Sequence, residues 1–213
     1  MSTWTSRAAA LAFALALSAC VAGTAPTGSA PRAVAVSGGA VTVTGPAGYC
    51  IARAASRNGP EGSFVLFGTC AALSGSSAAG QPAKPAVLTA SVVPGAADEP
   101  TFVASFPAMA RFFGSSAGRA ALSRSGKAAT VTVGTVSSRD GVLFLSLADS
   151  AAGPGQSVAP DYWRAIFALR GHLVTLSVMS LADRPIDSAE KRRILDDFVA
   201  RMKQANAGAP AAG

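Results

Sequence analysis

The spacing of apolar residues predicts a series of short strands along this chain. Residues 40–44 (AVTVT) alternate between apolar and polar side chains and end at a Gly-Pro turn, which is typical of a short strand. Residues 63–70 (SFVLFGTC) are apolar at both odd and even positions, which predicts a central strand covered on both faces. Residues 86–93 (AVLTASVV) form the next expected strand.

Residues 128–137 and 142–148 are expected to form a first hairpin. The intervening Arg139-Asp140-Gly141 suits a three-residue turn with Gly141 in the left-handed conformation. With that turn, one face of the hairpin is strongly apolar. It is formed by Val131, Val133, Thr135, Leu143, Leu145 and Leu147.

Residues 162–169 and 172–179 are expected to form a second hairpin around Arg170-Gly171. A two-residue turn sets a register in which one face is almost wholly apolar and the other is half polar. We take the first as the core face. It carries Trp163, Ala165, Phe167, Leu169, His172, Val174, Leu176 and Val178.

Helical periodicity is strongest at the end of the chain. Residues 188–204 repeat apolar side chains at helical spacing, with Asp187 as the expected N-cap and Glu190 as its capping-box partner. We expect this helix to pack on the core face of the second hairpin. Shorter helices are expected at residues 50–56, 107–113 and 118–125.

These elements predict a single α+β domain, with a mostly antiparallel sheet of about six or seven strands packed by the long C-terminal helix. Over residues 162–202, the hairpin that opens with Tyr162-Trp163 and the helix that follows resemble the end of the PsbP-like fold. Members of that family are often exported accessory proteins without enzymatic activity, so the resemblance implies such a role. It carries no motif of functional residues onto this sequence.

The N-terminal segment has the pattern of an export signal. Arg7 precedes an apolar run at residues 8–19. This run is shorter than the roughly 20 residues that a membrane-spanning helix needs, and it has the length of a secretory leader. Leu17-Ser18-Ala19-Cys20 closes it, and residues 1–20 resemble the signal of bacterial lipoproteins.

That resemblance implies cleavage before Cys20 and attachment of acyl chains to it, which anchors the protein stably in the lipid bilayer. Val21 stands where lipoproteins kept in the inner membrane have Asp, so the resemblance favours the outer membrane. The alternative is an ordinary signal peptide cut after a later small residue such as Gly23. A periplasm-facing cell-envelope protein is expected.

Composition sets the domain boundaries. Residues 1–19 form the signal peptide, and residues 20–39 form the lipidated cysteine and a tether whose small side chains bury too little surface to fold. A flexible coil of that length spans roughly 25 Å. Residues 40–204 form the α+β domain, and residues 205–213 form a disordered tail.

The net charge is +7, and it falls to +6 without Arg7. An ordinary basic surface explains this charge, and so does attraction to anionic lipid headgroups near the anchor. No dense basic run is interleaved with aromatic residues, so we expect no nucleic-acid partner.

The chain has three cysteines. With Cys20 lipidated, Cys50 and Cys70 form an even pair in an oxidising compartment, which predicts a disulfide. A redox pair is the alternative, although redox motifs have C-x-x-C spacing. No metal site is expected because the chain has one histidine, and no cofactor-binding motif is present.

Two sequence features are candidates for chemistry. Gly114-Ser115-Ser116-Ala117-Gly118 matches the G-x-S-x-G motif of serine hydrolases, in which Ser116 is the nucleophile. The chain order of the triad would be completed by an acid, Asp140, Asp149 or Asp161, followed by His172. No oxyanion-hole motif accompanies it, so we expect no catalytic residues. Arg164 and Arg170 with Tyr162 are a second candidate, as a small anion site or as a solvated face.

Three hypotheses for function remain. The favoured one is a non-catalytic envelope lipoprotein whose domain binds a partner protein or supports envelope assembly. The second is a lipoprotein that binds a lipid or small amphipathic ligand in a cavity between the sheet and the helix. The third, remote hypothesis is a serine hydrolase using Ser116.

Overall fold

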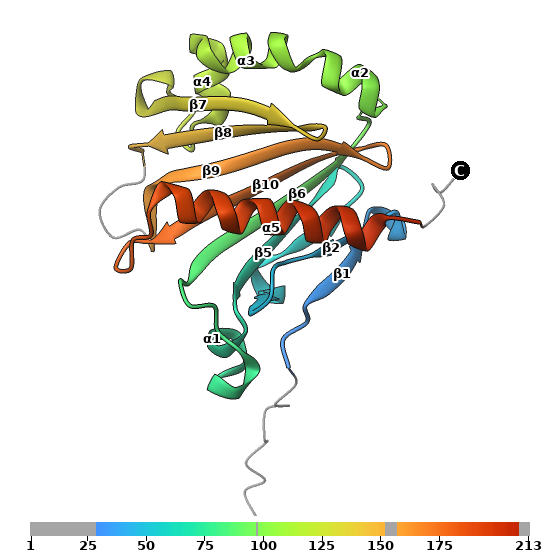
Figure 1. Cartoon of the computed structure of the whole chain (residues 1–213), viewed down its shortest axis with the longest axis vertical. Coiled ribbons are helices and arrows are strands. Elements are labelled where there is room, and N and C mark those ends of the chain that lie inside the picture. Colours follow the sequence, from blue (N-terminus) through green and yellow to red (C-terminus); the bar gives the residue numbers. More distant parts are fainter. Residues whose placement is uncertain (1–28, 97, 152–156, 209–213) are drawn as a thin grey trace, which may run out of the picture.

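A computed structural model of the chain describes residues 29–96, 98–151 and 157–208. One antiparallel sheet of eight strands dominates it, in the order β3-β5-β6-β10-β9-β8-β7, with β4 also paired to β5 (Figure 1). Its strands are β3 (Tyr49–Ile51), β4 (Arg57–Gly59), β5 (Gly62–Thr69), β6 (Ala86–Pro94), β7 (Val131–Arg139), β8 (Val142–Asp149), β9 (Val158–Leu169) and β10 (His172–Leu181).

In the described part of the chain, five α-helices accompany the sheet, together with the short 3-10 turns η1 (Ser37–Gly39), η2 (Arg53–Ala55), η3 (Ser77–Ala79) and η4 (Ala128–Thr130). The helices are α1 (Cys70–Ser74), α2 (Glu99–Ala104), α3 (Phe106–Gly114), α4 (Ser116–Leu122) and α5 (Ser188–Asn206). Helix α5 crosses one face of the sheet, α2 to α4 lie by its β7 end, and α1 lies at the opposite end (Figure 1). The predicted α+β class is therefore confirmed.

The main core lies between α5 and the sheet, as predicted. Phe67 of β5 meets Phe198 of α5 edge to face, with ring centroids 5.3 Å apart. The buried side of the second hairpin, which includes Phe167, packs in the same cluster. Asp187 begins the helix by accepting the Glu190 N–H at 2.7 Å, so the predicted N-cap is confirmed.

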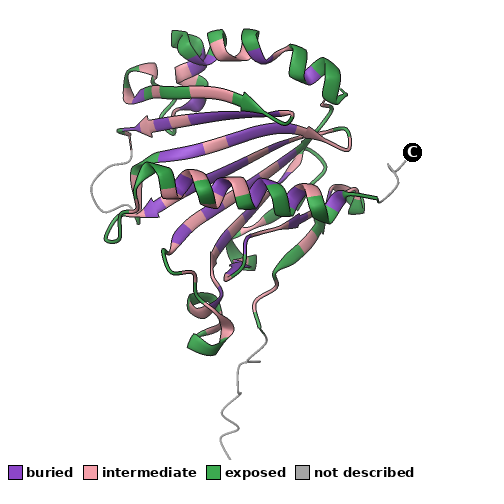
Figure 2. Ribbon diagram, in the orientation of Figure 1, coloured by how far each residue is buried: buried purple, intermediate pink, exposed green. Residues whose placement is uncertain are grey.

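A second core covers only half of the opposite face. Side chains of α2 to α4 pack on β7, β8 and β9, around Leu145, Tyr162 and Ile166. Among the described residues, none from β5 belongs to this second core. Buried and intermediate positions alternate along most of β5 (Figure 2), and Phe64 and Leu66 are half-buried. The prediction that both faces of this strand are covered was therefore wrong on one face.

Both hairpins close with two-residue turns. The second has the predicted register, with His172 opposite Leu169 and positive φ at Arg170 and Gly171. The first differs from its prediction, because positive φ at Asp140 and Gly141 makes a two-residue turn that the right-handed strand twist favours.

A bulge between Val133 and Val136 corrects the alternation of the first hairpin. It places Val136, and not Thr135, opposite Leu145 in the second core. The bulge absorbs the one-residue difference between the two turn lengths. The predicted apolar face of this hairpin is therefore present, with Val136 in place of Thr135.

The N-terminal boundary of the domain needs correction. Residues 33–36 were assigned to the tether, yet they form strand β1 (Ala33–Val36), which pairs with β2 (Val41–Thr44) in a separate two-stranded sheet. Val36 is buried in the main core. The folded domain therefore begins before residue 33, and the segment between Cys20 and the domain is shorter than predicted.

The β1–β2 hairpin is attached to the domain by α5. Asn206, in the last turn of that helix, accepts the Thr42 N–H at 2.9 Å and donates to the Thr42 carbonyl at 2.8 Å. Its amide thus bonds both backbone groups of one strand residue, as a neighbouring strand does. A two-stranded hairpin alone is marginally stable, so this attachment holds β1 in place.

Candidate functional site

The predicted disulfide is present. Cys50 and Cys70 are bonded, with Cα atoms 4.8 Å apart, and both are buried. The expected helix at residues 50–56 is instead β3 followed by η2, so the bond joins a short strand to the start of α1. Cys20 lies outside the described residues.

Ser116 does not lie in a nucleophile elbow. It begins α4 directly after α3, so the motif joins two helices, whereas an elbow joins a strand to a helix. Ser115 is the N-cap of α4 and accepts the Gly118 N–H at 3.1 Å. A Cβ at position 118 would collide with the Phe112 carbonyl, so packing of the two helices explains this glycine.

His172 opens β10 and is half-buried. Its Nδ1 lies 2.7 Å from the Arg170 carbonyl oxygen. Because a carbonyl only accepts hydrogen bonds, Nδ1 carries the proton here. Among the described residues, no contact joins His172 to Ser116. His172 contacts the carbonyl of the hairpin turn, and Ser116 begins α4.

Tyr162 has two arginines nearby, but they differ from the predicted pair. Arg164 lies over the ring at 5.3 Å, and its Nε donates to Ser177 Oγ at 3.2 Å. The second is Arg124, at 6.0 Å, rather than Arg170, which lies in the hairpin turn. These contacts use the arginines to cover the tyrosine ring.

Asp149 is a buried carboxylate with a structural role. It accepts the N–H groups of Arg124 at 2.8 Å and Ala151 at 3.0 Å. Burial acts to raise the pKa of Asp149, and these hydrogen bonds outweigh burial, so the pKa is lowered below its ordinary value. The carboxylate fixes the loop before η4 against the end of β8.

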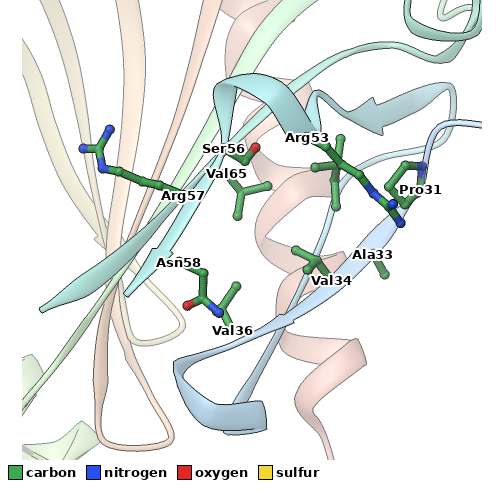
Figure 3. Close-up of a pocket in the computed structure, with 10 residues that line it drawn as sticks. Pro31, Ala33, Val34, Val36, Arg53, Ser56, Arg57, Asn58 and Val65 are labelled. Carbon is green, nitrogen blue, oxygen red and sulfur yellow. The ribbon is translucent and has the colours of Figure 1, made fainter. Parts of the chain in front are cut away.

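An apolar groove lies between β1 and the η2–β4 segment (Figure 3). The Ile51 N–H donates to the Pro31 carbonyl at 2.7 Å at one end of β1. At the other end, the Ser37 N–H donates to Asn58 Oδ1 at 3.3 Å. The two segments separate between these hydrogen bonds and enclose about 260 Å³.

The groove has an apolar floor that belongs to the main core. Val36, Ile51 and Val65 form this floor and are almost fully buried. Val34 and Pro31 add apolar wall on the β1 side. A ligand in the groove would therefore rest directly on core side chains.

Hydrogen-bond donors stand at the two ends of the groove. The Arg53 guanidinium extends toward Pro31 at one end, while the Arg57 guanidinium is turned away (Figure 3) and lies 5.0 Å from the Phe64 ring. At the other end, Asn58 Oδ1 must face the Ser37 N–H, so its amide nitrogen lies on the groove side near Val36 (Figure 3).

No carboxylate lines this groove, and none among the described residues forms an ion pair with Arg53. Ser56 is already satisfied, because its Oγ donates to the Ala52 carbonyl and accepts the Leu66 N–H. The remaining polar groups at the ends are therefore donors. Such a groove suits a small molecule with an apolar body and an anionic or carbonyl-bearing head.

Sequence reasoning missed this groove because it assigned one wall to the tether. The signal was present in residues 33–36 (AVAV), which alternate, precede a Ser-Gly-Gly turn and are followed by a second alternating run. The second wall was hidden by the expected helix at residues 50–56. The cavity also lies beside β1, not between the sheet and α5.

In residues 29–96, 98–151 and 157–208, no group of three or more His, Cys, Asp or Glu side chains is arranged to hold a metal ion. Within the same residues, no helix is both long enough and apolar enough to cross a membrane.

Comparison of the sequence with protein-family models and with curated proteins finds no match. Comparison of structures finds the Ran-binding protein Mog1p of Saccharomyces cerevisiae, with a TM-score of 0.37 and 10% identity over 82% of this chain and 91% of that chain. A mutant of Mog1 gives a TM-score of 0.36 and 10% identity over 82% and 92%. At these values the likeness supports no inference, and the PsbP-like resemblance stays a prediction.

Proposed function

We propose that this protein is a lipid-anchored, periplasm-facing lipoprotein of the bacterial cell envelope whose domain is a non-catalytic binding module for a small anionic amphiphile. The observation that carries the binding role is the groove with an apolar floor and donors at both ends. The anchor is proposed from the lipobox at Cys20, and the outer membrane is favoured over the inner one because Val21 follows it.

The dimensions and chemistry of the groove agree with such a ligand. A volume of about 260 Å³ lies just below the usual range for small-molecule sites, so the groove fits a short acyl or aromatic body. Burial of that body on Val36, Ile51 and Val65 supplies affinity in proportion to the apolar area removed from water. Arg53 and Asn58 then favour an anionic head over a neutral one.

Titration of the full chain with decanoate, and with decanol as an uncharged counterpart, tests this proposal. We expect decanoate to bind more tightly. Asn58→Asp keeps the acceptor that Ser37 and Ser63 use and replaces the free amide donor with a negative charge. It should weaken decanoate binding by about tenfold or more and leave decanol binding nearly unchanged.

A groove-filling variant supplies the second test. Val34→Trp should abolish binding of both probes, whereas Val93→Trp, a size-matched change at an exposed site outside the groove, should not. Equal binding by wild type and Val34→Trp would contradict the proposal. Native mass spectrometry of protein extracted from membranes then identifies the natural ligand.

The anchor has its own test. Cys20→Ala should prevent incorporation of labelled fatty acid and release the protein from the membrane fraction. Labelling that persists in this variant would refute lipidation at Cys20, whatever the groove binds.

An envelope protein is a second candidate partner. The observation that favours it is the pair of exposed apolar side chains Phe112 and Val103 on α3 and α2, which are 47% and 38% exposed. Crosslinking in native membranes should capture a defined protein, and Phe112→Ser should abolish that crosslink. A crosslink pattern unchanged by Phe112→Ser would refute this candidate surface.

A further inference from the structure

One end of the domain lies where the described chain begins. We call this surface the tether end, and its defining side chains are Arg32, Arg53 and Leu73. A hollow of about 650 Å³ brings Ser29 and Pro31 together with Arg53 and Leu73. Arg32 adjoins them and donates to the Ala79 carbonyl at 3.3 Å.

The tether end combines exposed apolar and cationic groups. Leu73, on α1, is 39% exposed. Arg32 and Arg53 are exposed as well, and neither forms an ion pair with a described carboxylate. An exposed apolar side chain on a surface that also carries arginines is typical of surfaces that rest in the headgroup region of a bilayer.

Carboxylates are scarce near this surface. From residue 29 to residue 97 the sequence has one, Glu61. It lies in the turn before β5, whereas α1 follows the last residue of that strand, so about 26 Å of strand separates them. Asp183 shares a hollow with Ala71 and Ala72 of α1. Asp183 and Asp187 each have a cation within 4.0 Å, Arg184 and Lys84 respectively.

We infer that the tether end docks on the anionic phospholipid surface of the membrane that holds the anchor. Leu73 enters the headgroup region, and Arg32 and Arg53 bind lipid phosphates. This inference rests on the proposed lipid anchor. Eight residues lie between Cys20 and Ser29, and the nine Cα–Cα steps span at most about 32 Å, so the anchor holds this end of the domain close to the bilayer.

Close approach is needed because surface potentials decay within about 8 Å at physiological ionic strength. Each arginine near an anionic surface contributes about fivefold to the docked population, so the pair contributes about 25-fold. The anchor supplies a high local lipid concentration, which lets two charges and one apolar side chain suffice.

Leu73→Trp in the full-length lipidated protein provides the reporter. In vesicles of brominated phosphatidylcholine with phosphatidylglycerol, we expect its emission to be quenched and the quenching to be relieved by high salt. In brominated phosphatidylcholine alone, we expect little quenching. Trp163 is buried in the main core and adds the same background to every sample.

The arginines are tested on the same reporter. Arg32→Ala with Arg53→Ala should lower the docked population about 25-fold. The control, Arg193→Ala with Arg201→Ala, removes the same charge from the exposed side of α5 and should leave quenching unchanged. Quenching that is the same with and without phosphatidylglycerol, or that persists after Arg32 and Arg53 are replaced, would overturn the docking.

Flotation separates the two proposals. A lipidated chain floats with vesicles of either composition, and failure to float with uncharged vesicles would refute the anchor. In a chain that floats with both compositions, quenching of the Leu73→Trp reporter that does not depend on phosphatidylglycerol would overturn docking and leave the anchor in place. Decanoate affinity of Arg32→Ala should equal wild type, because Arg32 does not line the groove.

Discussion

Truncation of Asn206 to alanine should detach the β1–β2 hairpin from the domain. Asn206 is 6% exposed. Its side chain makes three hydrogen bonds, one accepted from the Thr42 N–H and two donated to the carbonyls of Thr42 and Met202. Thr42 has no other described partner for this edge of β2. Without the Asn206 amide, the backbone N–H and C=O of Thr42 lose their protein partners, and water reaches them only in part.

The structure sets the size of the effect. Thr42 is half-buried, so water replaces the lost partners only in part, and each of its two groups costs about 1–1.5 kcal/mol. The free energy of unfolding should therefore fall by about 2–3 kcal/mol. For a domain of this length, that lowers Tm by about 5–10 °C.

Urea unfolding and amide hydrogen exchange measure this prediction. The Thr42 amide should lose protection by about 30- to 100-fold, because its acceptor is removed. Gln204→Ala, at an exposed site two residues earlier in α5, is the control and should leave both readouts unchanged. Asn206→Asp should be worse than alanine at neutral pH, since its carboxylate faces two carbonyls.

Two results would refute the reasoning. One is a loss of stability below about 0.5 kcal/mol in Asn206→Ala, the level of an ordinary surface change. The other is unchanged exchange at Thr42, which would mean that the hairpin keeps its place without the Asn206 amide.

Three further changes test other parts of the fold. Replacing Cys50 and Cys70 with alanine should cost about 3 kcal/mol in urea unfolding and make stability insensitive to reductant, whereas stability of the wild type should fall in reductant. Asp149→Asn should lower the free energy of unfolding by about 1–3 kcal/mol at neutral pH. Because the pKa of Asp149 is lowered by folding, its contribution is present above about pH 4 and is lost as pH falls through the folded-state pKa, so the difference from wild type should narrow in acid. Gly118→Ala should lower stability by more than about 2 kcal/mol through its clash with α3, while Gly114→Ala, whose Cβ meets no atom within 4 Å, should not; equal Tm values for the two variants would contradict this.

Sequence reasoning succeeded where local pattern and tertiary environment agree. The second hairpin is the best case, because Arg170-Gly171 dictates a two-residue turn and the alternation on both strands fits it. Helix α5 was predicted correctly for the same reason, because the N-cap Asp187 directly precedes the segment whose apolar residues repeat at helical spacing. The disulfide followed from counting cysteines in an assumed oxidising compartment.

Predictions failed where distant contacts decide the structure. Strand β1 has little apolar surface of its own, and it is ordered by pairing with β2 and by burial of Val36 in the main core. The bulge in β7 adjusts a register that the turn sequence alone left ambiguous. The Asn206 amide joins residues 164 positions apart, and no local pattern signals it.

The groove depends on these same long-range contacts, which links stability to binding. Its β1 wall is fixed by pairing with β2, by the Pro31 and Ser37 hydrogen bonds and, through Thr42, by Asn206. Asn206 does not line the groove, so any effect on binding must pass through the position of β1. If ligand and amide hold the same wall, decanoate should protect Thr42 from exchange, and Asn206→Ala should weaken decanoate binding while Gln204→Ala leaves it unchanged. Binding that is equal in both variants would mean that the wall keeps its place without α5, and the groove would then be independent of the helix that attaches it.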